Sequence, residues 1–274
     1  MIKYSLFKEI NVRYSDEGKG RVIVLLHGFM ESMEIWKDFS KDLARSFRVI
    51  CIDLPGFGDT PSIGYVHSME LLAACVKAVL DTEGLRRYVL LGHSMGGYVA
   101  LAFTDLFHDN VKGLCLFHST ALADTDEKKR SRDKAIQLVK KNPLAYVRLF
   151  FEPLFAAQNV KNHQEDIVRL EENAKAFSKR AIINSLEGMK DRKRRDWILE
   201  MSKFPILFII GKQDSLIPFE SVLKQTKLVK NPDVLLLENA GHMGFLEARQ
   251  ETWKTVRKFT WKCFKKTSGI AIPE

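Results

Sequence analysis

The chain has 274 residues, 46% of them hydrophobic and 28% charged, which suits one large folded domain and excludes a disordered protein. No apolar run approaches the roughly 18 residues that a membrane-spanning helix needs, and the N-terminus lacks a signal-peptide pattern, so we expect a cytoplasmic protein that binds no membrane. The formal net charge of +9 comes largely from lysines and arginines at helical spacing, in 189–196 and 253–266, which is typical of solvated helix faces rather than of nucleic-acid binding.

Short apolar runs alternate with amphipathic patterns along the first part of the chain. Residues 21–28 and 47–56 are rich in Val, Ile and Leu and end at Gly, which predicts buried parallel strands. Between them, apolar residues recur every three or four positions, which predicts a helix over 32–46. A second helix is predicted over 67–84, and it leads directly into a strand at 87–92.

The alternation continues with one long interruption. Further strands are predicted over 111–119, 204–214 and 233–242. The stretch between the first two of these is mostly helical in pattern and far longer than an ordinary helical crossover. The sequence therefore predicts an α/β fold with an open, mostly parallel sheet and helices on both faces. Its expected parts are a core formed by 1–119 and 198–274 and an inserted helical cap formed by 120–197.

One serine stands between glycines where the strand at 87–92 meets the next helix. The run Gly92-His93-Ser94-Met95-Gly96 has the form G-x-S-x-G, in which a tight strand-to-helix turn requires small neighbours. Such a turn exposes the serine hydroxyl at the carboxyl end of the strand, in front of the amides that begin the helix. We therefore interpret Ser94 as a nucleophile.

A serine nucleophile needs a base, and the base needs an acidic partner. His242 follows the last predicted strand, so a parallel sheet would bring it to the same edge as Ser94. Asp214 ends the preceding strand and is the preferred partner, since it reaches that edge too. Asp124 and Asp53 are the alternatives, although Asp53 is expected to tie down its own loop.

Chemistry at a carbonyl also requires donors for the oxyanion and a wall around the substrate. The backbone amide of Met95 follows the nucleophile directly, and the amide of Phe29 lies in the loop after the first long strand. Both are predicted to form the oxyanion hole. Seven residues are candidates for the pocket wall: Met30, His118, Tyr146, Phe150, Phe151, Phe155 and Met243.

The chain order Ser, Asp, His, together with four separated motifs, resembles the α/β-hydrolase family. The motifs are HGFM at 27–30, DLPGFGD at 53–59, GHSMGG at 92–97, and GKQDSLIP at 211–218 with AGHMGFLE at 240–247. The resemblance implies an eight-stranded sheet, a helical cap after the sixth strand, and neither a metal nor an organic cofactor. The cysteines agree with the absence of a metal site, because none has the paired spacing of zinc ligands: Cys51, Cys75, Cys115 and Cys263.

Within this family, a serine at the nucleophile position disfavours the branches that carry aspartate there, such as the dehalogenases and epoxide hydrolases. We expect a hydrolase of small carboxylic esters that forms an acyl-enzyme. The same residues would serve a C–C bond hydrolase, a thioesterase, a perhydrolase or a small-molecule lyase or synthase, and the fold is also used by ligand receptors and scaffolds. The sequence leaves the substrate and the oligomeric state open, a homodimer included.

Overall fold

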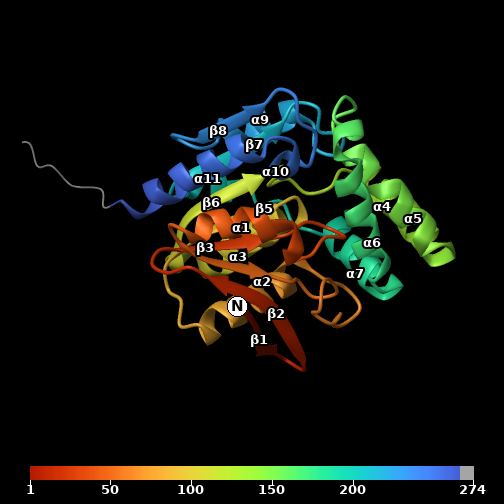
Figure 1. The fold of residues 1–274 in the computed structure, drawn as a ribbon, viewed down its shortest axis with the longest axis horizontal. Helices are drawn as coiled ribbons and strands as arrows, with labels where there is room; N and C mark the ends of the chain where they lie inside the picture. The colour runs from red at the N-terminus through yellow and green to blue at the C-terminus, as the bar shows by residue number, and fades with distance from the viewer. Residues whose placement is uncertain (266–274) are drawn as a thin grey trace, which may run out of the picture.

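The computed structural model describes residues 1–265 and is built around one eight-stranded sheet (Figure 1). Its strands run in the spatial order β1-β2-β4-β3-β5-β6-β7-β8, and all neighbours from β4 to β8 are parallel. The prediction of a mostly parallel sheet is confirmed. The strands are β1 (Ile2–Phe7), β2 (Ile10–Glu17), β3 (Val22–Leu26), β4 (Arg48–Ile52), β5 (Tyr88–His93), β6 (Val111–Phe117), β7 (Ile206–Gly211) and β8 (Asp233–Leu237).

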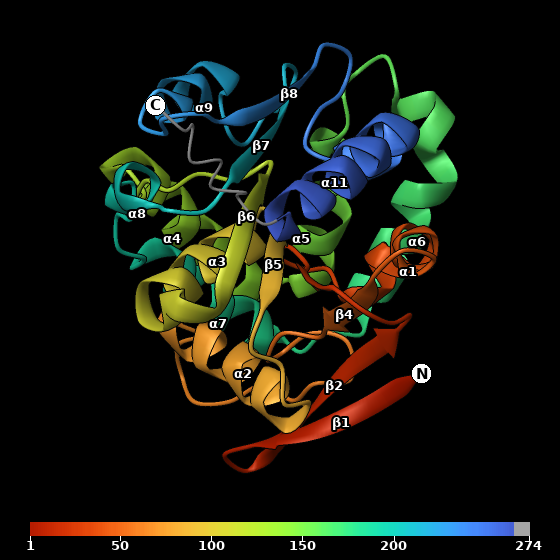
Figure 2. The same cartoon turned by 90° about the vertical axis from the view of Figure 1, so that its left-hand side faces the viewer.

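Helices cover both faces of this sheet. Figure 2 shows α1 and α11 on one face and α2 and α3 on the other. The α-helices are α1 (Lys37–Ala44), α2 (Met69–Thr82), α3 (Met95–Phe107), α4 (Asp126–Lys141), α5 (Pro143–Phe150), α6 (Gln164–Lys175), α7 (Lys179–Lys190), α8 (Trp197–Met201), α9 (Phe219–Thr226), α10 (Gly244–Glu247) and α11 (Arg249–Phe264). Short 3-10 helices are η1 (Met33–Trp36), η2 (His108–Asn110), η3 (Glu152–Leu154) and η4 (Val160–His163). No described helix is long and apolar enough to cross a membrane.

The antiparallel hairpin of β1 and β2 at the sheet edge is absent from the predicted elements. In β1 most of the apolar side chains point to solvent and a polar side chain is buried, which is the reverse of the usual pattern. In β1 the apolar side chains of Tyr4 and Leu6 are 56% and 69% exposed, whereas Ser5 between them is 3% exposed. β2 pairs with β4 in the antiparallel sense, and Arg48 of β4 adds a charged contact by donating to both carboxylate oxygens of Asp16 at 2.9 and 2.8 Å.

Several predicted strands end earlier than the apolar pattern suggests. β3 stops at Leu26, β7 at Gly211 and β8 at Leu237, where the pattern extends to 28, 214 and 242. The excess residues leave the sheet as loops at its carboxyl edge. The helix predicted over 32–46 is likewise divided into η1 and α1. His27 and Gly28 after β3 are buried although they are not in a strand, whereas Lys212 and Gln213 after β7 are exposed.

Helices α4 to α7 lie between β6 and β7 in the chain and beyond the carboxyl ends of the central strands in space (Figure 1). α4 packs against α5 and α7, and α5 packs against α6, so these helices form a layer of their own. Two ion pairs hold the ends of this insertion. Asp124 at its start bonds Arg192 near its end at 2.6 Å, and Arg195 bonds Glu70 of α2, also at 2.6 Å.

We predict that Asp124→Ala destabilises the protein by about 3–5 kcal/mol, because it leaves two largely buried guanidinium groups without their carboxylate. The Asp124 side chain is fully buried and pairs with Arg132 and Arg192. Burial opposes its ionisation, but the two arginines outweigh this and lower its pKa from 3.8. The stabilisation is therefore complete above pH 4 and is lost as the pH falls through the lowered value.

Urea unfolding of the wild type and of Asp124→Ala, at pH 7 and at pH 3, measures the difference in their free energies of unfolding and how it changes with pH. The control is Asp109→Ala, whose carboxylate is 91% exposed and should change stability by less than about 0.5 kcal/mol. A loss for Asp124→Ala no larger than that of the control would contradict the structural role.

Candidate active site

The turn at Ser94 is built by contacts that leave no room for side chains on its flanks. Ser94 has a φ of 49° and a ψ of −114°, a strained conformation for a residue with a side chain. A Cβ on Gly92 would collide with the carbonyl oxygen of Gly96, and a Cβ on Gly96 would collide with that of Leu26. The turn is held by the amide of Ser94, which donates to Phe117 at 2.9 Å. β5 and α3 therefore meet at this one residue.

Asp214 and His242 come from the loops after β7 and β8 and meet at the same edge. His242 Nδ1 lies 2.7 Å from Asp214 Oδ2, and both side chains are 2% exposed. The other Asp214 oxygen accepts from the amides of Leu216 and Ile217, at 2.8 and 2.9 Å. Burial opposes ionisation of Asp214, but the charge and hydrogen bond of His242 outweigh it and lower its pKa to about 2.

An ionised Asp214 only accepts hydrogen bonds, so the proton between the two groups belongs to Nδ1 of His242. The second ring nitrogen, Nε2, is then an acceptor. Nε2 is buried and has no hydrogen-bond partner among residues 1–265, and that includes Ser94. This pair therefore presents a base that is held by its carboxylate and free on its other side.

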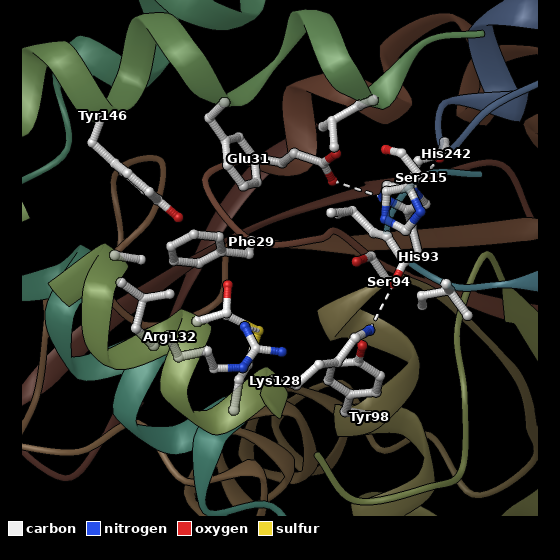
Figure 3. Close-up of a pocket in the computed structure, with 18 residues that line it drawn as sticks. Phe29, Glu31, His93, Ser94, Tyr98, Lys128, Arg132, Tyr146, Ser215 and His242 are labelled. Carbon is white, nitrogen blue, oxygen red and sulfur yellow. Dashed lines mark hydrogen bonds and ion pairs between the residues drawn. The ribbon is translucent and has the colours of Figure 1, made fainter. Parts of the chain in front are cut away.

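Ser94 and His242 both line one cavity of about 310 Å³ (Figure 3). Its wall combines residues from the loops after β3, β5, β7 and β8 with residues of α3, α4, α5 and α7. The lining residues are Phe29, Glu31, His93, Ser94, Tyr98, Lys128, Ser131, Arg132, Ala135, Tyr146, Phe150, Leu154, Leu186, Met189, Ser215, Leu216, Ile217 and His242.

The predicted oxyanion donors lie beside this cavity. Met95 is the first residue of α3, so its amide has no acceptor within the helix. Within the described chain, nothing accepts from the amide of Phe29 either. The ring of Phe29 packs edge-on against Phe150 of α5, with 5.4 Å between the ring centroids, and this contact orients the loop. Both amides are free to bind an oxygen.

Of the seven predicted wall residues, two line the cavity and five lie outside it. Tyr146 and Phe150 are one turn apart on α5 and face the cavity together. His118 instead lies behind the acid, with Nδ1 at 3.6 Å from Asp214 Oδ2, and it accepts from the amide of Gly244 at 3.1 Å. The five outside the cavity wall are packed into the core: Met30, His118, Phe151, Phe155 and Met243.

The alternative acids bond no histidine in the structure. Asp53 accepts from the amides of Met33 and Asp59, at 2.7 and 3.1 Å, and so joins two loops. Asp124 is occupied by arginines, as described above. Residues 1–265 also contain no group of three or more His, Cys, Asp or Glu side chains arranged to hold a metal ion.

Glu31 and His93 form a buried pair that is not among the predicted site residues. His93 Nδ1 lies 3.0 Å from Glu31 Oε2, and His93 Nε2 lies 2.9 Å from the backbone oxygen of His242. Both neighbours are acceptors, so an ionised Glu31 requires a doubly protonated His93. Burial opposes this charge, but Glu31 outweighs it and raises the pKa of His93. The same Glu31 oxygen accepts from the amide of Gly28 at 2.5 Å.

The Glu31–His93 pair thus connects three loops: the loop with Phe29, the turn with Ser94 and the loop with His242. The sequence carried a single signal for it, a lone carboxylate in the apolar run HGFMESM. A glutamate in such a loop usually points to solvent, and only the tertiary structure turns it inward.

Comparison with known proteins agrees with this architecture. The family model described as alpha/beta hydrolase fold matches residues 21–249. A dihydrolipoyllysine-residue acetyltransferase component of an acetoin cleaving system from Pseudomonas putida is 29% identical over 245 residues, which are 89% of this chain but only 64% of that protein. A pimeloyl-[acyl-carrier protein] methyl ester esterase from Pseudoalteromonas atlantica is 29% identical over 242 residues, 85% of this chain and 92% of that protein.

Among solved structures, a thermophilic esterase from Thermogutta terrifontis is similar with a TM-score of 0.90 and 26% identity, over 97% of this chain and 100% of that chain. The family model spans most of the sequence, and the eight-stranded, mostly parallel sheet with helices on both faces agrees with it. The chain therefore belongs to the α/β hydrolase fold family.

Proposed function

We propose that this protein is a serine hydrolase that cleaves small carboxylic esters through an acyl-enzyme on Ser94. The observation that carries the proposal is that Ser94 and His242 line one cavity, while His242 is hydrogen-bonded to an ionised Asp214. The similarity to esterases supports an ester as the substrate. The free amides of Phe29 and Met95 support chemistry at a carbonyl group.

In the first step, Ser94 Oγ attacks the ester carbonyl carbon while His242 Nε2 takes the hydroxyl proton. The carbonyl oxygen becomes an oxyanion, and the amides of Phe29 and Met95 stabilise it by hydrogen bonds. When the tetrahedral intermediate collapses, the ester C–O bond breaks and His242 gives its proton to the leaving alcohol. Water then attacks the acyl-enzyme in the same way, which releases the acid and restores Ser94.

Two buried carboxylates support these steps without touching the substrate carbonyl. Asp214 holds His242 in the tautomer that leaves Nε2 basic and stabilises the imidazolium that forms. Glu31 acts as a positioning residue, because it holds the amide of Gly28 and the charged ring of His93, which in turn holds the backbone of His242.

The segment 120–197 acts as a cap on a core formed by 1–119 and 198–274, of which 266–274 lie outside the described residues. α4 and α5 of this cap supply much of the cavity wall, Tyr146 and Phe150 included. A cavity of about 310 Å³ is at the small end of ordinary ligand pockets, which favours a compact acyl group.

We predict that Ser94→Ala lowers kcat for p-nitrophenyl esters by at least about 10⁴-fold, since it removes the nucleophile. The melting temperature should stay the same or rise, because alanine adds no bulk to the turn. Labelling by a fluorophosphonate should also be abolished, while Ser221→Ala in α9 keeps it. A folded Ser94→Ala protein with wild-type activity would exclude the mechanism. If the wild type cleaved the matching thioester but not the ester, the protein would be assigned as a thioesterase.

Asp214→Asn is expected to lower kcat by about 10³- to 10⁴-fold with the fold intact. A neutral amide can hold the wrong tautomer of His242 and cannot stabilise its charged form. Steady-state kinetics and circular dichroism are the measurements, and Asp59→Asn, at an exposed loop position, is the control. The acid is wrongly assigned if Asp214→Asn keeps more than a tenth of the wild-type kcat.

Glu31→Gln should lower kcat by about 10²-fold and leave KM nearly unchanged, as a small displacement of the catalytic groups would. Without its counterion, His93 loses one ring proton and can no longer donate on both sides. Glu34→Gln, in the next turn of the chain and 44% exposed, is the matched control. A merely structural role for Glu31 would instead give a lower melting temperature with an unchanged kcat for the folded fraction.

A further inference from the structure

The α4 side of the cavity carries two cations that the proposed ester hydrolysis does not use. Lys128 and Arg132 are one helical turn apart on α4, and both line the cavity. Figure 3 shows both side chains extending into the space that the labelled cavity residues surround. Two charged groups at this spacing present their donors to one region of space.

These cations are incompletely neutralised. Arg132 pairs with Asp124, but Asp124 also pairs with Arg192 at 2.6 Å, so two guanidinium groups share one carboxylate. Lys128 has no carboxylate within ion-pair distance anywhere in residues 1–265. These three cations share one carboxylate, and the two that line the cavity, Lys128 and Arg132, are left with an excess of positive charge.

The other charges around the cavity offset this excess only in part. Glu31 is balanced by His93, whereas Asp214 keeps its negative charge beside a His242 that carries a single ring proton. A cavity that keeps uncompensated positive charge beside its nucleophile is electrostatically complementary to an anion.

Donor groups are also left over on this wall. Lys128 Nζ donates to the carbonyl oxygen of Leu216 at 2.6 Å, which uses one of its three N–H groups. Arg132 bonds Asp124 through Nε and, at 3.5 Å, through Nη2, and its Nη1 lies 3.6 Å from the sulfur of Met189, a weak acceptor. One N–H on each terminal nitrogen is therefore left over. An oxygen-rich anion is the partner that both groups lack.

The side chains that line the cavity between these cations and Ser94 indicate what joins the anionic group of the ligand to its ester group. Phe29, Phe150, Leu186 and Met189 give it an apolar character, which suits a short methylene chain. A planar carboxylate can bind an ammonium and a guanidinium at once, because it has two oxygens with several lone pairs.

We propose that the substrate is a half-ester of a short dicarboxylic acid, whose free carboxylate binds Lys128 and Arg132 while Ser94 attacks the ester carbonyl. This inference rests on the proposed esterase function and names its substrate class. The carboxylate belongs to the acyl part, because that part stays in the cavity through both steps while the alcohol leaves after the first.

The reaction is an ordinary hydrolysis. The acyl C–O bond of the half-ester breaks, a bond to Ser94 Oγ forms, and the alcohol takes the serine proton through His242. Water then cleaves the acyl–Oγ bond, so the products are the alcohol and the dicarboxylate. The distant carboxylate is unchanged and serves only as a handle.

The test compares two chromogenic esters of equal chain length, p-nitrophenyl hemiadipate and p-nitrophenyl hexanoate. The wild type should prefer the hemiadipate in kcat/KM. Lys128→Met should lower kcat/KM for the hemiadipate by about 10- to 100-fold, because it removes one hydrogen bond to a charged group. It should change kcat/KM for the hexanoate by less than about twofold. Lys129→Met, at the exposed neighbouring position on α4, should affect neither ester.

An equal loss on both esters would overturn the inference and make Lys128 a clamp on the loop of Leu216. Unchanged kinetics on both would overturn it as well. These outcomes differ from failure of the proposed function, in which the wild type would hydrolyse neither ester. Calorimetry with adipate on the Ser94→Ala protein needs no turnover: Lys128→Met in that background should weaken adipate binding at least tenfold, and equal binding would also contradict the proposal.

Discussion

The close approach of β3, β5 and the start of α3 at Ser94 is the constraint on which the rest of the site depends. Glycine is required at positions 92 and 96 because the backbones of neighbouring elements occupy the space of a side chain. This contact places the serine at the carboxyl edge of the sheet, where the loops after β7 and β8 also end. The backbone contacts at Gly92 and Gly96 fix the position of Ser94, and the other residues of the cavity are arranged around it.

Charge then fixes the loops around that turn. Three buried carboxylates, Glu31, Asp124 and Asp214, each pair with a cationic or imidazole group from a distant part of the chain. Glu31 joins the loop after β3 to the turn, Asp214 joins the loops after β7 and β8, and Asp124 joins the two ends of the helical insertion. A buried carboxylate without its partner would be costly, so each pair also specifies one arrangement of its loops.

The local sequence pattern predicts the proposed catalytic residues better than it predicts the residues that line the cavity. The turn at Ser94 and the loops of Asp214 and His242 carry glycines and polar residues at strand ends, and a parallel sheet brings such ends together. The wall carried no such signal. Phe150 faces the cavity and Phe151 faces the core, although they are apolar neighbours at one helix end, because the packing of α5 against α4 and α6 decides its rotation.

The sequence by itself determined the α/β architecture, the family and the residues proposed for the chemistry, since apolar periodicity and obligatory glycines are local properties of the chain. Only the tertiary structure decided the edge hairpin, where Ser5 is buried and Leu6 is exposed, and the inward position of Glu31. It alone also decided that Lys128 lacks a carboxylate within the described chain while two arginines share Asp124. Burial and pairing of charge depend on residues far apart in the chain, and no local pattern contains them.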